Sequence, residues 1–515
     1  MKTLFLFLSV LCAVAWGLTP QQVVVVYNAD SPLSKESAEM YAAVRRVPQE
    51  NLVPLSGLNP GAQSLSRRDY EDKVVEPLMR AALANNWQWP TGVPKGMKRM
   101  AAMVLMPDLP LRINEQVVRP VPKNPDGTPN YAVRPPEDAA ALDSELALLG
   151  ATYPLTSALN NPFYKKDAAI DKATPPVLAV CRIDGPDAAT IHRMIQDPVT
   201  AERRGLWGWT VVDEGGPYPQ GDAVFKAVAD MARQNGQPLF YETSKETLAP
   251  AFPLMPHTAV YFGWYTHMAD GPFAPTAPLD FQFEPGAVAC HLHSFSCTNI
   301  KDAHQWAPAL LARGACVTTG NVAEPLLAGC LDFAVFYDRL LKGYTVAEAG
   351  LMAMPMLSWQ AIVIGDPLYR PYAVLKAGRG DAKNPFVAWS RMLKAAKGNT
   401  VLAENAVKKQ LSGSGAAFYA EMYAWECANN GNLYAAADYF RMAGAAAAAP
   451  QDKLRNKLMQ ITTLFVAGDR DSAAALMHQC LEETEGTPHF PAVEKTAATV
   501  LKHEGWKPKP KQPTR

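Results

Sequence analysis

One pattern recurs three times between Ala259 and Pro325, and it constrains the fold more than any other feature of the chain. Each time, a short apolar run ends in small, aromatic and reactive residues: AVYFGWYTHMADGPF, PGAVACHLHSFSC and LLARGACVTTGNVAEP. A buried parallel strand has this form, because its apolar residues lie in the core and the following loop carries polar groups. We therefore predict three strands whose carboxyl ends hold any functional site. The candidate residues at these ends are His267, Cys290, His291, His293, Ser294 and Glu324.

Strand-like and helix-like segments alternate from Val23 to Val374. The β-branched run Val23–Tyr27 predicts a strand, and the amphipathic segment Ser34–Arg46 predicts the helix that follows it. Further helices are expected over Asp138–Leu149 and from Asp187 to Met194. Such alternation is typical of an α/β fold with a mostly parallel sheet flanked by helices.

Beyond Phe386 the sequence changes to alanine-rich helical segments. NNGNLYAAADYFRMA and VAGDRDSAAALMHQCL are related, with Gly431 and Gly468 at equivalent places, so the offset is 468 − 431 = 37 residues. This spacing predicts a small all-α domain of tetratricopeptide-like (TPR-like) repeats, and a plain helical hairpin domain is the alternative. The expected divisions are a signal peptide at 1–17, an α/β domain at 18–375, a linker at 376–385, the helical domain at 386–506 and a disordered tail at 507–515.

The first residues have the features of a secretory signal peptide. Lys2 precedes an apolar run from Leu4 to Val14, and small residues follow it up to Gly17. We expect an exported protein, periplasmic or extracellular, with no membrane span after removal of the signal. The 49 basic and 49 acidic residues balance, so the composition does not favour nucleic acid as a partner.

Several motifs in order resemble the gingipain-like cysteine peptidases, which have a caspase-like α/β core. An uncharacterised family of secreted bacterial proteins with such a core is more similar still. The resemblance covers roughly Val23 to Pro371 and rests on VVVVYNADSP, AAMVLMPDLPL, LDSELALLG, PPVLAVCRIDGPDAATIHRMI and VIGDPLYRP. It implies a caspase/gingipain-like fold for the α/β domain.

The resemblance also implies a cysteine peptidase mechanism with a Cys–His dyad, in which a thiolate attacks a carbonyl group. The dyad histidine follows one strand and the cysteine follows the next, which matches His267 and Cys290. Asp143 stands where gingipain-like chains place an aspartate, and either Asp143 or Glu324 can orient the histidine. The substrate would be a peptide or protein, and no cofactor is expected.

A second hypothesis is a different hydrolase. Residues two apart on a strand point to the same side, so His291 and His293 can share a metal ion or a substrate oxygen. A zinc site would need a further ligand such as His267, His304 or Glu324. Ser294 is an alternative nucleophile beside His293.

A third hypothesis is a non-catalytic binding protein that keeps the α/β scaffold and uses the helical domain to contact a partner. Its ligand would be a peptide or protein, and the oligomeric state is open. Under the first and third hypotheses, side chains near the strand ends line the binding groove: Trp264, Tyr265, His291, His293 and Phe295.

Overall fold

The computed structural model describes residues 17–89, 96–114, 125–127, 139–149, 151, 158–170, 176–243, 245, 248, 257–277, 281–376, 378–381 and 383–507. The predicted signal peptide lies outside these residues except for Gly17, as does most of the proline-rich stretch 116–136 and the tail beyond Lys507.

The first half of the sheet contains four parallel strands. They are β1 (Val23–Asn28), β2 (Leu52–Leu55), β6 (Ala102–Leu105) and β10 (Ala179–Arg182), and they lie side by side in the order β2-β1-β6-β10. Beside β10 runs β17 (Ala361–Ile364) in parallel, and β15 (Thr318–Asn321) pairs with β17 in the antiparallel sense.

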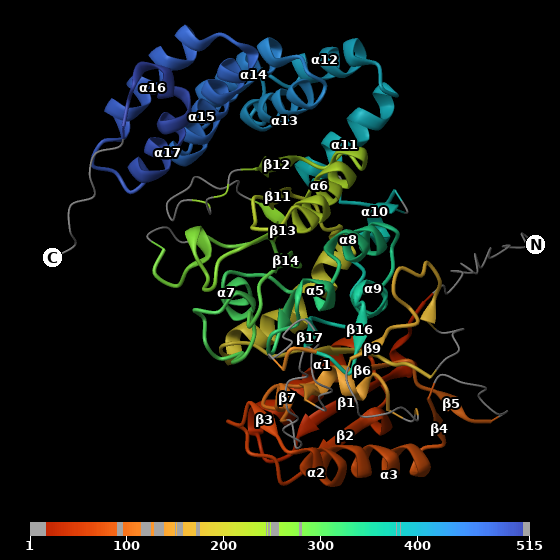
Figure 1. The fold of residues 1–515 in the computed structure, drawn as a ribbon. Helices are drawn as coiled ribbons and strands as arrows, with labels where there is room; N and C mark the ends of the chain where they lie inside the picture. Colours follow the sequence, from red (N-terminus) through yellow and green to blue (C-terminus); the bar gives the residue numbers. More distant parts are fainter. Residues whose placement is uncertain are drawn as a thin grey trace, which may run out of the picture.

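The second half repeats this arrangement with four more parallel strands. They are β11 (Trp209–Asp213), β12 (Leu239–Glu242), β13 (Thr258–Gly263) and β14 (Val288–His291), in the order β12-β11-β13-β14. A parallel bridge between Val288 and Val317 joins β14 to the residue before β15, so the strands form one continuous row (Figure 1).

The two halves therefore share one topology. When the four parallel strands of each half are numbered in chain order, both halves have the order second, first, third, fourth across the sheet. Because β15 and β17 are antiparallel, the strands of the two halves run in opposite directions. The carboxyl ends of β13, β14 and β15 share one edge, which is where the sequence predicts the site.

The strands are continuous apolar runs because helices cover both faces of the sheet. In β1, Val23 and Val25 belong to one buried cluster, whereas Val24 and Val26 belong to another on the opposite face. The first cluster includes side chains of α1 (Pro32–Arg45), α5 (Ala188–Arg204), α6 (Pro219–Gln234), α8 (Phe333–Leu341) and α9 (Val346–Ala353). On the other face lie α3 (Glu76–Ala84) over the first half and α7 (Trp306–Ala312) over the second.

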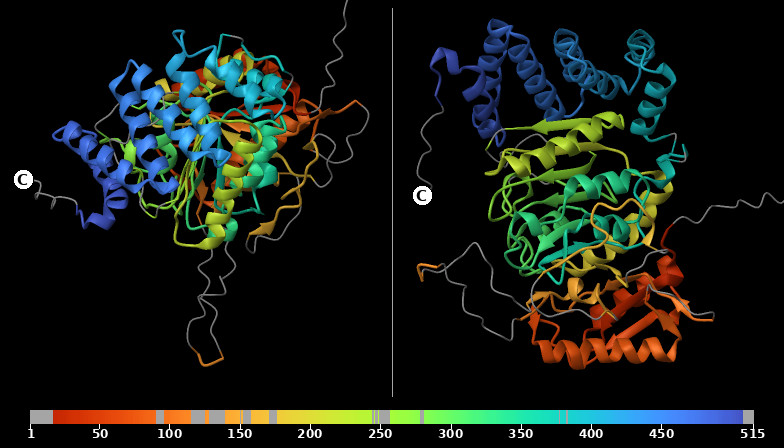
Figure 2. Two further views of the ribbon diagram at one scale, coloured as in Figure 1. Left: turned by 90° about the horizontal axis from the view of Figure 1, so that it is seen from above. Right: turned by 45° about the vertical axis from the view of Figure 1, so that its right-hand side comes forward.

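The chain after β17 is helical. Its helices are α10 (Ala373–Lys376), α11 (Pro385–Ala396), α12 (Thr400–Lys408), α13 (Ala416–Asn429), α14 (Leu433–Ala446), α15 (Pro450–Ala467), α16 (Arg470–Thr484) and α17 (Phe490–Val500). Helices α11 to α17 lie beyond β12 at one end of the molecule, opposite α2 (Arg67–Tyr70) and α3 (Figures 1 and 2). Edge-to-face contacts of Trp209 with Phe386 and Trp425 attach them to the sheet.

The mixed α/β architecture with a mostly parallel sheet and a helical C-terminal region confirms the predicted fold class. Among the described residues, no helix is both long and apolar enough for a membrane span. The remaining short elements are β3 (Ser64–Leu65), β4 (Trp87–Gln88), β5 (Lys98–Arg99), β7 (Arg112–Ile113), β8 (Ala140–Ala141), β9 (Leu159–Asn160), β16 (Met356–Leu357) and α4 (Leu142–Leu146).

Three local expectations need correction. The helix predicted over Asp138–Leu149 is shorter, because the chain pairs as strand β8 before α4 begins. The helix predicted to end at Met194 continues to Arg204, since Ile195 and Ala201 extend its buried face. The four-residue strand β12 has no clear apolar alternation, so the sequence pattern does not predict it.

Candidate functional site

The loops after β13, β14 and β15 bring together four of the predicted residues. Tyr265 and His267 follow β13, His293 follows β14, and Glu324 follows β15. The amide N–H of Leu292 donates to the carbonyl of Gly263 at 2.8 Å, which holds the segments after β13 and β14 together. The parallel register of β13 and β14 thus fixes these side chains at one edge of the sheet.

His293 lies at the centre of this cluster. The centroids of its ring and that of His267 are 5.2 Å apart in an edge-to-face arrangement. The ring centroid of Tyr265 lies 4.7 Å from that of His293. His293 is only 5% exposed, whereas Tyr265 and His267 are exposed above it. The outer surface is therefore a phenol and an imidazole supported from beneath by a second imidazole.

The environment favours the neutral form of His293. Burial lowers its pKa, and the neighbouring His267 lowers it further, whereas the contact with the Ser294 carbonyl and the charge of Glu324 oppose this shift. Because a carbonyl oxygen only accepts, the contact between Nδ1 of His293 and the Ser294 oxygen places the ring proton on Nδ1. Burial, Tyr218 and Glu324 raise the pKa of Tyr265, which stays a phenol.

Asn321, which the sequence analysis did not single out, holds this turn in place. Its side-chain amide donates to the His293 carbonyl at 2.9 Å, and its backbone N–H donates to Oγ of Ser296 at 3.0 Å. Asn321 is the last residue of β15, so the carboxyl end of a third strand fixes the loop after β14. The available sequence signal was a polar residue at the end of a predicted strand, four positions after Val317.

The loops at this edge carry exposed apolar side chains, here called the rim. Twelve large apolar side chains are exposed among the described residues, and six of them lie in loops at this edge. They are Tyr218, Tyr265, Met268, Phe295, Leu326 and Leu327. Tyr218 connects to the cluster through an edge contact with Tyr265, with centroids 6.5 Å apart. Large exposed apolar side chains in neighbouring loops are a feature of interaction sites.

Cys290 does not join the site. Its side chain is fully buried in the core cluster that contains Phe262 and Phe333. Burial raises the pKa of its thiol to about 12. This corrects the expectation of a Cys290–His267 dyad: along β14 alternate residues face opposite sides of the sheet, and Cys290 faces the side away from His291.

His291 is also part of the core. Its ring stacks on Trp306 with centroids 3.4 Å apart, and its Nδ1 lies 3.0 Å from the Tyr261 hydroxyl. Burial lowers its pKa well below the usual value. In the part of the chain that the structure describes, no three His, Cys, Asp or Glu side chains converge as metal ligands, and the rings of His291 and His293 pack against different partners.

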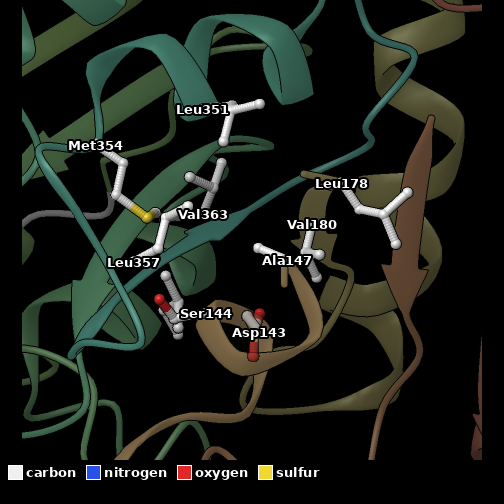
Figure 3. Close-up of a pocket in the computed structure, with 10 residues that line it drawn as sticks. Asp143, Ser144, Ala147, Leu178, Val180, Leu351, Met354, Leu357 and Val363 are labelled. Carbon is white, nitrogen blue, oxygen red and sulfur yellow. The ribbon is translucent and has the colours of Figure 1, made fainter. Parts of the chain in front are cut away.

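Asp143 serves the core as well. Its two carboxylate oxygens accept from Arg182, from Nε at 3.1 Å and from a terminal nitrogen at 2.5 Å. Figure 3 shows Asp143 and Ser144 beside a cavity of about 10 Å³, among apolar side chains such as Leu351 and Met354. The carboxylate neutralises a fully buried arginine, and it does not orient His267.

Of the predicted groove residues, Trp264 is buried, whereas Phe295 is exposed. The indole N–H of Trp264 donates to Asp222 at 3.0 Å, and its ring stacks on Phe225. Ser294 is half-buried beside His293, and the carboxylate of Glu324 accepts the amide N–H of Leu326 at 2.8 Å. The edge therefore offers a surface of aromatic, imidazole and apolar groups.

Comparisons with known proteins add little to this description. No family model matches the sequence, and a search of curated proteins finds no match. Among solved structures, a protein described as "Structure of Protease" aligns over 69% of this chain and 79% of its own, with 11% identity and a TM-score of 0.37. A likeness at this level carries no argument about fold or chemistry.

Proposed function

We propose that this chain is a peptide-binding protein built on a caspase/gingipain-like α/β core, and that it does not use a cysteine nucleophile. The observation that carries the proposal is the contrast between Cys290, fully buried in the core, and the exposed cluster of Tyr265 and His267 at the strand ends. The caspase/gingipain-like assignment itself rests on the sequence motifs and their order.

Thiol chemistry is disfavoured for every cysteine in the described residues. All seven are free and buried. The thiolate is the nucleophilic form, and a thiol with a pKa of about 12, as in Cys290, is almost entirely protonated at pH 7. A Cys–His peptidase mechanism would require a rearrangement of β14 that exposes its sulfur.

The same edge suits a peptide ligand. Its rim combines six exposed apolar side chains with the hydroxyl of Tyr265 and the ring nitrogens of His267. Apolar side chains of a peptide can pack on the rim, and its main-chain amides can bond to the phenol and the imidazole. Aromatic groups with a polar tip are enriched at such binding surfaces because they serve both kinds of contact.

The test is a binding measurement with short random peptides displayed on phage and selected on the folded, mature chain. We expect the selected peptides to bind the Tyr265→Ala variant at least about tenfold more weakly, a loss of about 1.4 kcal/mol. Tyr434→Ala removes an exposed tyrosine on α14 and is the matched control.

The same peptides are incubated with the chain and analysed by mass spectrometry. We expect them to stay intact. Cleavage that disappears in His293→Ala or Ser294→Ala would overturn the proposal in favour of a hydrolase, and equal binding by Tyr265→Ala and the wild type would remove this edge as the binding site.

We propose further that the chain is exported and that its C-terminal helices form TPR-like repeats. Export is tested by expression of the full chain in a bacterium, followed by fractionation and determination of the mature N-terminus. A mature chain that begins near Leu18 in the periplasm or medium supports export, and a full-length chain retained in the cytoplasm contradicts it.

A further inference from the structure

The strand β12 lies at the end of the row of strands. Among the described strands only β11 pairs with it. The Thr210 N–H bonds to the Pro238 carbonyl, and the Glu214 N–H bonds to the Glu242 carbonyl. Main-chain groups alternate in direction along a strand, so those of Tyr241 and Thr243 point to the side away from β11.

The C-terminal helices cover this edge but do not close on it. Figures 1 and 2 show α13, α15 and α17 beyond β12. Between them and the strand lies a groove of about 420 Å³. Natural proteins cover exposed sheet edges to prevent pairing with other chains. Here the cover leaves room beside the strand, in the size range of ligand pockets.

One wall of the groove is apolar and largely aromatic. Phe240 of β12 meets the edge of Trp425, with ring centroids 6.3 Å apart, and Trp425 meets Phe440 at 5.3 Å. Met459 and Val466 of α15 continue this wall. Val466 is 70% exposed, so it presents apolar surface at the groove. The wall can therefore take up apolar side chains of a ligand.

Polar groups interrupt this apolar lining, which favours a peptide over a lipid chain. Glu242 lies beside Asp213 in the register of β12 and β11, and Lys495 of α17 lines the same groove. Burial and Glu242 raise the pKa of Asp213, and the charge of Lys495 opposes this shift. Threonine side chains on α15 and α17 add hydroxyls to the lining. An extended peptide, in which apolar side chains alternate with main-chain amides, matches such a mixed lining.

We propose that this groove binds an extended peptide that pairs with the outer side of β12 and places its apolar side chains against Phe240 and Trp425. The main chain of the peptide supplies hydrogen bonds to the strand, and alternate side chains supply specificity. A four-residue strand is about 13 Å long, so about four peptide residues pair with it. This site is separate from the cluster at the ends of β13 and β14.

The experiment uses the whole mature chain and short apolar peptides selected by phage display on the Tyr265→Ala variant, in which the other site is weakened. Val466→Glu places a charge on the apolar wall, and Val401→Glu, at a position that is 61% exposed on α12, is the matched control. We expect Val466→Glu to weaken binding at least tenfold and Val401→Glu to leave it unchanged. Amide hydrogen exchange should slow at residues 239–243 when peptide is bound.

Three outcomes would overturn the proposal. The first is that the selected peptides bind the Val466→Glu variant as tightly as the Val401→Glu control. The second is that they bind without protecting the amides of β12 from exchange. The third is a wild-type dimer in sedimentation that Val466→Glu abolishes, which would make a second copy of the chain the occupant. Because selection uses Tyr265→Ala, a failure here leaves the proposed function at the other site untouched.

Discussion

At the scale of single residues, direction along a strand decides what each candidate can do. Cys290, His291 and His293 are neighbours in sequence, yet the sulfur of Cys290 joins one core cluster and the ring of His291 packs on Trp306 in the other. Only His293, beyond the last strand residue, reaches the exposed cluster with Tyr265 and His267. A difference of one position moves a side chain to the opposite face.

The burial of Cys290 gives a direct prediction about its reactivity. Iodoacetamide should not label Cys290 in the folded chain across the neutral pH range, because its pKa is raised to about 12 and its side chain has no exposed surface. It should label readily after denaturation. Peptide mapping by mass spectrometry measures both states, and fast labelling of the folded chain that His267→Ala abolishes would restore the dyad.

At the scale of elements, the site depends on how α6 packs under the loop after β13. Gly216 and Gly221 leave room for the buried indole of Trp264, the residue before Tyr265. A Cβ atom at Gly221 would lie 1.8 Å from a ring carbon of Trp264, so any larger residue must displace the indole. The position of the exposed tyrosine is thus tied to a glycine in a helix.

We expect Gly221→Ala to destabilise the fold by about 1–3 kcal/mol through overpacking, and to weaken peptide binding at the cluster as well. Gly444→Ala is the matched control, since a Cβ atom in α14 would be 3.5 Å from its nearest neighbour, an ordinary contact. The control should raise stability by about 0.5–1 kcal/mol, because alanine favours helix. Urea unfolding measures both variants, and a neutral Gly221→Ala would contradict the packing argument.

At the scale of the whole molecule, the loop after β14 joins the two halves of the sheet. Lys301 in this loop pairs with Asp184, which follows β10, at 2.8 Å and lies 3.5 Å from Asp108, which follows β6. Asp184 is almost completely buried, and burial raises its pKa, while Lys301 and Arg182 oppose that shift. One lysine thus neutralises carboxylates at the strand ends of the other half.

Lys301→Met should lower the free energy of unfolding by on the order of 2–3 kcal/mol at pH 7. This loss is smaller than the roughly 3–5 kcal/mol lost when one partner of a fully buried ion pair is removed. The reason is that the Lys301 side chain is 32% exposed. Without Lys301 the pKa of Asp184 rises further, so the folded form takes up a proton at a higher pH than the unfolded form does. The deficit should therefore shrink as the pH falls toward the usual pKa of an aspartate.

The matched control is Lys98→Met, which removes an exposed pair with Glu50 and should change stability by less than about 1 kcal/mol. Urea unfolding across a series of pH values measures both variants. A Lys301→Met deficit that is as small as the control, or that grows on acidification, would show that this lysine does not neutralise Asp184.

The sequence by itself determined most of the strands, the mostly parallel character of the sheet and the edge at which the candidate residues gather. Val23–Tyr27 lies in a strand as expected, because a continuous apolar run stays buried only between two layers of helices. The loops after the predicted strands hold Tyr265, His267, His293 and Glu324, since parallel strands end at a common edge.

Only the tertiary structure decided which way each side chain points and what meets it there. Both faces of the sheet are apolar, so the pattern around Cys290 contains no signal that distinguishes core from site, and Asp143 differs from an active carboxylate only through its contact with Arg182. The edge strand β12, its groove and the lysine that joins the halves likewise depend on segments far apart in sequence, which only packing brings together.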